Sequence, residues 1–147
     1  MDEDSELPEI EIVRATETQS KMTKEFSELS NKKILVVDND LFRVQFFQEI
    51  FKNNNVDIAS SYDKAVTLLN NGEYDLICLD YDLGLDKKGT KVAEYMLAGD
   101  FSRQTKVMVQ SMNKEGSQQI STLLAGIYDV EVCPFDFIYK NFGEKNA

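Results

Sequence analysis

Five short apolar runs alternate with segments of helical periodicity, and this alternation constrains the fold more than any other feature of the chain. Each run is almost continuously apolar, which is typical of strands that are covered on both faces. The runs span residues 34–38, 56–60, 75–80, 106–110 and 129–133, and the helical segments between them span about 41–53, 63–71, 89–98 and 116–125. This order predicts a doubly wound, parallel five-stranded α/β sheet.

Two of the expected strands end in carboxylates. Asp38 ends the first run and Asp40 follows it, while Asp80 ends the third run and Asp82 follows it. Ser111 follows the fourth run. Because ligands of parallel sheets bind at the carboxyl ends of the strands, we expect Asp38, Asp80 and Ser111 to converge there. The pattern predicts a site for a cation or a phosphoryl group.

The charge of the chain is distributed unevenly. Its 147 residues fit one domain, and the net charge is −10. Residues 1–31 hold nine acids and three bases, so we expect an acidic extension before a domain at 32–147. Neither part has the basic patch that binds phosphate backbones, which argues against direct contact with nucleic acid or anionic membranes.

Two residue types limit the chemistry. The chain has no histidine, which excludes Ser-His-Asp, Cys-His and His-metal sites. Cys78 and Cys133 lie inside apolar runs, so we expect packed, reduced thiols. The start of the chain does not resemble a signal peptide, and no apolar span approaches the roughly 20 residues of a membrane helix. We therefore expect a soluble, cytoplasmic protein.

From about Lys33 to Phe137 the chain resembles a response-regulator receiver domain of two-component signalling. The resemblance rests on Ile-Leu-Val-Val-Asp38, Tyr74-Asp-Leu-Ile-Cys-Leu-Asp80, Ser111 and Cys133-Pro134-Phe135. It implies a flavodoxin-like fold with strand order 2-1-3-4-5. It also implies that Asp80 is the phosphoacceptor and Ser111 the switch hydroxyl. Magnesium would be held by Asp38, Asp80 and Asp82, with Asn39 and Asp40 as further candidates.

The sequence departs from the receiver pattern at several positions. Cys133 stands where receivers have a lysine that pairs with the phosphoryl group, and Asn39 replaces the second acid of the first strand. Met112 stands where a small residue is expected. Val130 stands at the switch-aromatic position, with Tyr128 two residues away. These departures argue for attenuated phosphorylation.

The resemblance also concerns the surfaces of the domain. The first helix of receivers commonly faces a kinase or phosphotransferase, so Phe42 and Phe46, together with Tyr128, are candidates for a partner surface. Only twelve residues follow Phe135, so the last helix is expected to be short or missing. Its place could be covered by a short amphipathic helix at 20–30, carrying Met22, Phe26 and Leu29, by a second copy of the chain as a homodimer, or by another signalling protein.

A narrower resemblance points to receiver-like domains proposed to process cyclic phosphates. It rests on Leu79-Asp-Tyr-Asp-Leu-Gly84, Gly89 and Gln110-Ser-Met-Asn113. The two histidines of that pattern are replaced by Tyr81 and Gln110, which argues against acid-base turnover.

These observations leave three hypotheses for function. The leading one is a stand-alone receiver-like signalling protein with attenuated or lost phosphorylation, which acts through protein partners and is not an enzyme beyond autophosphorylation at Asp80. The first alternative is a competent, magnesium-dependent phospho-receiver. The second is a phosphoesterase that acts on small cyclic phosphates.

Overall fold

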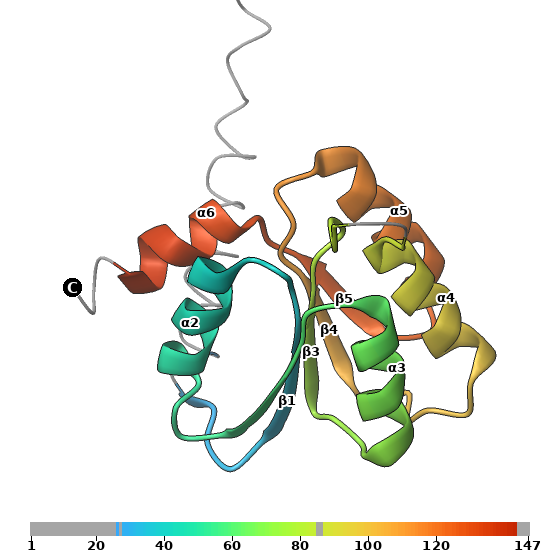
Figure 1. Ribbon diagram of the computed structural model, residues 1–147, viewed down its shortest axis with the longest axis horizontal. Coiled ribbons are helices and arrows are strands. Elements are labelled where there is room, and N and C mark those ends of the chain that lie inside the picture. Colours follow the sequence, from blue (N-terminus) through green and yellow to red (C-terminus); the bar gives the residue numbers. More distant parts are fainter. Residues whose placement is uncertain (1–25, 27, 85–86, 144–147) are drawn as a thin grey trace, which may run out of the picture.

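The computed structural model describes residues 26, 28–84 and 87–143. In this part of the chain, five parallel strands form one sheet of order β2-β1-β3-β4-β5, as the sequence predicts for a flavodoxin-like fold (Figure 1). The strands are β1 (Lys33–Val37), β2 (Asn55–Ala59), β3 (Leu76–Leu79), β4 (Lys106–Val109) and β5 (Asp129–Val132). The helices are α2 (Leu41–Ile50), α3 (Tyr62–Asn71), α4 (Gly89–Ala98), α5 (Lys114–Leu124) and α6 (Phe135–Ile138), which continues into the π-helix η2 (Tyr139–Gly143).

Both faces of the sheet are buried along the central strands β1, β3 and β4, which explains why these strands are almost continuously apolar. Helices α3, α4 and α5 cover one face, while α2 and α6 lie on the other (Figure 1). Successive residues of β1 point to opposite faces, so Leu35 belongs to the first core and Ile34 and Val36 belong to the second. The doubly wound prediction is therefore confirmed.

The face beneath α2 is completed by residues that precede β1. Phe26 is buried, and its ring centroid lies 5.3 Å from that of Phe51, just after α2. Leu29 packs against the same apolar cluster. Most of the helix expected at 20–30, including Met22, lies outside the described residues, as does most of the acidic extension. The part that is described covers this sheet face in cis.

Helix boundaries differ from the sequence prediction in instructive ways. Helix α3 begins at Tyr62, one residue before the predicted start at 63, because Ser61 caps it and its hydroxyl accepts a hydrogen bond from the backbone of Lys64 at 3.2 Å. Asp63 lies in the first turn. Helix α5 begins at residue 114, not 116, because the Asn113 side chain caps it. Over the described ranges, no helix is long and apolar enough to cross a membrane.

Candidate functional site

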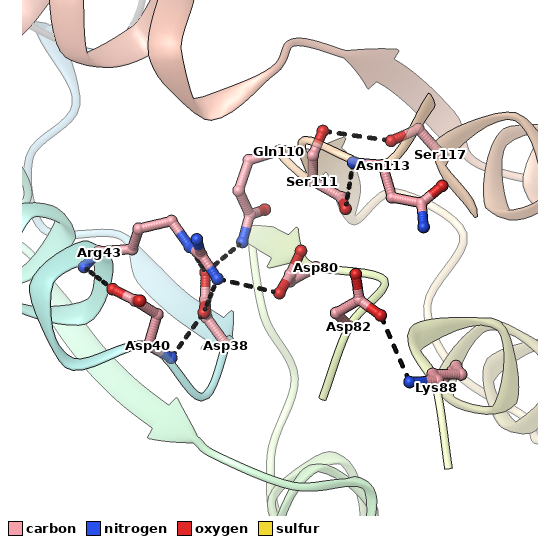
Figure 2. A network of polar contacts seen from close by, with 10 residues as sticks. All are labelled: Asp38, Asp40, Arg43, Asp80, Asp82, Lys88, Gln110, Ser111, Asn113 and Ser117. Atoms are coloured by element: carbon pink, nitrogen blue, oxygen red, sulfur yellow. Dashed lines mark hydrogen bonds and ion pairs between the residues drawn. The ribbon is translucent and has the colours of Figure 1, made fainter. Parts of the chain in front are cut away.

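Residues from three neighbouring strands gather at the carboxyl edge of the sheet. Asp38 follows β1, Asp80 follows β3, and Ser111 lies just beyond β4 (Figure 2). All three are almost completely buried, with 0%, 2% and 4% of their surfaces exposed. Burying carboxylates is costly unless their charge is compensated, so the partners of these two acids determine what the site can do.

The main partner is Arg43, which the sequence analysis did not identify. Its Nε lies 2.8 Å from Oδ2 of Asp38, and its Nη2 lies 3.0 Å from Oδ1 of the same carboxylate. The same Nη2 also lies 3.3 Å from Oδ2 of Asp80. Arg43 thus makes a two-pronged contact with one acid and reaches the second (Figure 2).

Helix α2 positions this arginine. Asp40 is the N-cap of α2, and its carboxylate accepts a hydrogen bond from the backbone of Arg43 at 3.0 Å. The cap places Arg43 in the first helical turn, with its side chain directed back over the end of β1. Its hydrogen bond to Asp38 raises the pKa of the guanidinium. The signal in the sequence was an arginine three residues after a capping acid that itself follows a strand-end acid.

The two carboxylates do not share the arginine equally. The pKa of Asp80 is raised from 3.8 to about 6, first by burial and then by the negative charge of Asp38. Arg43, the Ser111 hydroxyl and the backbone N–H of Tyr81 act in the opposite direction. Asp80 is therefore only partly ionised slightly below neutral pH.

A buried amide completes the group formed by Asp38, Asp80 and Arg43, which together with Gln110 is called the acidic pocket below. Gln110 is 0% exposed, and its Nε2 donates a hydrogen bond to Oδ2 of Asp38 at 3.3 Å. Its Oε1 has no hydrogen-bond partner in the described structure. In the sequence Gln110 marks only the place of a missing histidine, whereas in the structure its side chain contacts Asp38. It can donate and accept hydrogen bonds, but it cannot transfer protons near neutral pH.

Two glycines allow the chain to pass close to the site. A Cβ on Gly89 would collide with the carbonyl oxygen of Asp80, and the backbone N–H of Gly89 donates to the carbonyl of Tyr81 at 2.7 Å. A Cβ on Gly116 would collide with the ring of Tyr81. The Tyr81 ring thus packs closely against the start of α5.

The other predicted magnesium ligands have other partners or are exposed to solvent. The Asp82 side chain is 56% exposed and pairs with Lys88 at 3.3 Å, while Asp40 caps α2 and Asn39 is exposed. Among the described residues, no three acidic, cysteine or histidine side chains form a group that could hold a metal. With Arg43 between Asp38 and Asp80, this arrangement does not fit a divalent cation.

The lysine position has an apolar environment. Cys133 is 7% exposed and belongs to the core beneath α2, and burial raises the pKa of its thiol to about 11. A neutral thiol offers no charge to a phosphoryl group. The nearby ring of Phe135 instead lies 5.9 Å from the guanidinium carbon of Arg43.

The three candidate partner residues are placed differently. Phe42 is 57% exposed, and Phe46 is partly buried against the ring of Phe135. Tyr128 is only 5% exposed, and its hydroxyl accepts a hydrogen bond from Arg103 at 2.8 Å. In this structure Phe42 is accessible at the surface, whereas Tyr128 is part of the core.

Comparison with known proteins agrees with this geometry. A model described as the cyclic-phosphate processing receiver domain matches residues 33–126, more than half of the chain. The chain belongs to this receiver domain family. No curated protein matches it.

Solved structures show the same fold at low sequence identity. The phosphorylated cyanobacterial phytochrome response regulator RcpA is 18% identical with a TM-score of 0.63, over 80% of this chain and 93% of that one. TrrA from Thermotoga maritima, solved in complex with Mg(2+)-BeF, is 22% identical with a TM-score of 0.60, over 78% and 96%. A CheY-like receiver domain from Methylobacillus flagellatus is 16% identical with a TM-score of 0.60, over 78% and 98%. The chain is a divergent receiver domain of the response-regulator type.

Proposed function

We propose that this receiver domain signals through contacts with other proteins and that its aspartyl phosphorylation is attenuated or lost. The observation that carries the proposal is the position of Arg43 against both Asp38 and Asp80. Phosphoryl transfer to a carboxylate needs a divalent cation that bridges carboxylate and phosphoryl oxygens. Here a side-chain cation stands between the acids.

The lysine position supports the same proposal. The charge that a receiver lysine would supply to an acyl phosphate is absent at Cys133, whose thiol stays protonated. Arg43 supplies a positive charge, but it is already paired with Asp38 through two contacts. A phosphoryl group on Asp80 would have to compete for it.

An exposed aromatic surface supports action through partners. Leu41 and Phe42 at the start of α2 are 70% and 57% exposed, and Tyr139 beside them is 42% exposed. The ring centroid of Phe42 lies 5.6 Å from that of Tyr139. Such rings are common at the centres of protein interfaces. A kinase, phosphotransferase or downstream effector is the class of partner proposed.

The test is an amide NMR titration with magnesium and then beryllofluoride, a mimic of the aspartyl phosphate. We expect no saturable shifts at ligand concentrations of about 1 mM, the weak end of useful affinity. Saturable shifts that spread from Asp38, Asp80 and Ser111 in the parent, and that are absent from Asp80→Ala, would identify a competent phospho-receiver and refute attenuation.

A competent phospho-receiver is the second candidate, and one observation favours it. Asp80 and Ser111 are both retained and lie together at the strand ends, with a hydrogen bond from Ser111 acting on Asp80. Autophosphorylation by a small phosphodonor, detected by intact mass and lost in Asp80→Asn, distinguishes this candidate from the leading proposal.

Processing of small cyclic phosphates is the third candidate, and the family match favours it. The positions of the two histidines hold Tyr81, which packs on α5, and Gln110, which binds Asp38. Neither is a base near neutral pH, so we expect no turnover of cyclic phosphates by phosphorus NMR. Turnover that disappears in Asp80→Ala would establish the phosphoesterase instead.

A further inference from the structure

Several close contacts hold the Arg43 side chain in the acidic pocket. Its side chain is 23% exposed, makes three contacts of 3.3 Å or less with the two acids, and starts from a capped helix turn. A guanidinium is weakly hydrated and matches the geometry of a carboxylate, which makes arginine well suited to such a partly buried position. Arg43 therefore compensates the buried charge of Asp38 and Asp80 without any bound ion.

Gln110 gives a second, independent indication about the pocket. Its amide is completely buried beside Asp38, and its Oε1 lacks a hydrogen-bond partner. Buried polar atoms without partners are rare and call for an explanation. Because Nε2 faces a carboxylate, exchanging the two amide atoms would place oxygen against oxygen, so the observed orientation is the favourable one. The acidic pocket thus holds one amide oxygen without a hydrogen-bond partner, on a side chain that contacts Asp38.

We propose that Arg43 is the resident cation of this pocket and acts as a gate that keeps divalent cations out. A divalent cation and the guanidinium cannot both contact Asp38 and Asp80, because the same oxygen atoms would serve both and the two positive charges would repel at short range. Entry of the ion therefore requires that Arg43 withdraw toward solvent. The Gln110 oxygen then becomes available as a third oxygen ligand, the type that hard cations prefer.

This inference rests on the proposed function only in locating the receiver site at Asp38 and Asp80. It concerns access of the metal ion to the site, whereas the proposed function concerns phosphorylation. The two are distinguished by measuring magnesium binding alone, without a phosphoryl mimic.

The test compares Arg43→Gln with the parent in a magnesium titration followed by amide NMR, carried far enough above about 1 mM to measure the weak dissociation constant expected of the parent. We expect the dissociation constant of the variant to be lower by about tenfold or more, since tenfold corresponds to about 1.4 kcal/mol of lost competition. The matched control is Arg103→Gln, which removes the same charge from an arginine that binds Tyr128, away from the acidic pocket. Its dissociation constant should equal that of the parent.

Two results would overturn the proposal. One is an Arg43→Gln dissociation constant within about twofold of the parent, a difference below about 0.5 kcal/mol. The other is an equal gain in Arg103→Gln, which would reveal a general effect of net charge. Adding Asp38→Asn to Arg43→Gln should abolish the gain, and a gain that persists would place the ion elsewhere and refute the gate.

Removal of Arg43 leaves two buried acids without a counter-ion, so a second variant guards against loss of folding. Arg43→Lys keeps the charge but has no fork that can bridge two carboxylates, and its ammonium is more readily hydrated. We expect its magnesium affinity to lie between those of the parent and Arg43→Gln. A value equal to the parent's would refute a gate that depends on the guanidinium.

Discussion

The replacement Asp80→Asn tests how much the buried charge of Asp80 lowers the stability of the fold. The pKa of Asp80 is raised from 3.8 to about 6, chiefly by burial, and the side chain is 3% exposed, so screening by solvent is small. A pKa that is higher by about 2 in the folded state corresponds to about 3 kcal/mol of lost stability when the group is ionised. Asparagine removes this charge with little change in shape.

The contact of 3.3 Å with Arg43 lowers the pKa of Asp80 and is therefore already contained in the net value of about 6. We expect Asp80→Asn to be more stable than the parent by about 2–3 kcal/mol at pH 7.5. In a domain of this size such a gain raises the melting temperature by about 6–12 °C.

The sign of the pH dependence follows from the direction of the pKa change. The folded protein holds an extra proton on Asp80 between about pH 4 and pH 6, so the parent gains stability as the pH falls through this window. The advantage of Asp80→Asn is therefore full above about pH 6 and disappears near pH 4, where the parent's carboxyl is protonated too.

Urea unfolding of the parent and Asp80→Asn at a series of pH values from 4 to 8 measures this difference. Asp82→Asn is the matched control, because it makes the same replacement at a carboxylate that is 56% exposed and should change the stability by at most about 0.5 kcal/mol. An Asp80→Asn variant that is less stable at pH 7.5, or equally more stable at every pH, would refute the assignment of a strained, ionisable Asp80.

Three further predictions concern packing and capping. Gly89→Ala places a methyl group against a backbone carbonyl and should cost about 3 kcal/mol, while Gly72→Ala meets only the flexible end of a lysine and should cost less than about 1 kcal/mol; equal thermal shifts would contradict this. Ser61→Ala removes the cap of α3 and should lower the free energy of unfolding by about 1 kcal/mol, whereas Asp63→Ala should lower it by at most about 0.5 kcal/mol. The reverse order in urea unfolding would identify Asp63 as the cap. Cys133→Lys puts a charge into an apolar core and should cost about 2–4 kcal/mol more than Cys133→Ala; equal unfolding free energies would mean that the new ammonium reaches water or the acidic pocket.

The fold was predictable because the strand pattern admits few alternatives. Ile34 and Leu35 are adjacent, both apolar and both 0% exposed, which requires cover on both faces of the strand. A parallel sheet between two helical layers provides this cover for strands that are joined by helices. The order of the strands came from the resemblance to receivers, and the structure confirms it.

The helix boundaries were less predictable, since neighbouring residues compete for the same capping role. Ser61 and Asp63 both have side chains that can accept from the first turn, and the sequence does not say which residue has extended backbone. In the structure Ser61 has φ −153° and ψ 165°, the extended conformation of a cap. That choice depends on where β2 ends, which is a property of the sheet.

The charge balance of the site could not be predicted from the sequence, for a different reason. The sequence shows Cys133 where a lysine is expected, and this reads as the loss of a positive charge. In the structure Arg43 of α2 supplies a positive charge that contacts Asp38 and Asp80, although it lies far from residue 133 along the chain. The exchange is not equivalent, because a receiver lysine is available to an incoming phosphoryl group, whereas Arg43 is already committed to the resting acids.

The position of Arg43 also ties the acidic pocket to the exposed aromatic surface. Its guanidinium carbon lies 5.9 Å from the ring of Phe135, and that ring lies 6.3 Å from Phe42 and 6.1 Å from Tyr139. Any event that draws Arg43 away from Asp38 and Asp80 must therefore change the contacts of Phe135. If the proposed partner shifts Phe135 when it binds over Phe42 and Tyr139, it also changes the stability of the Arg43 position, because coupling between two sites is reciprocal. Phe135 thus connects the position of Arg43 to the aromatic surface at which we propose that a partner binds.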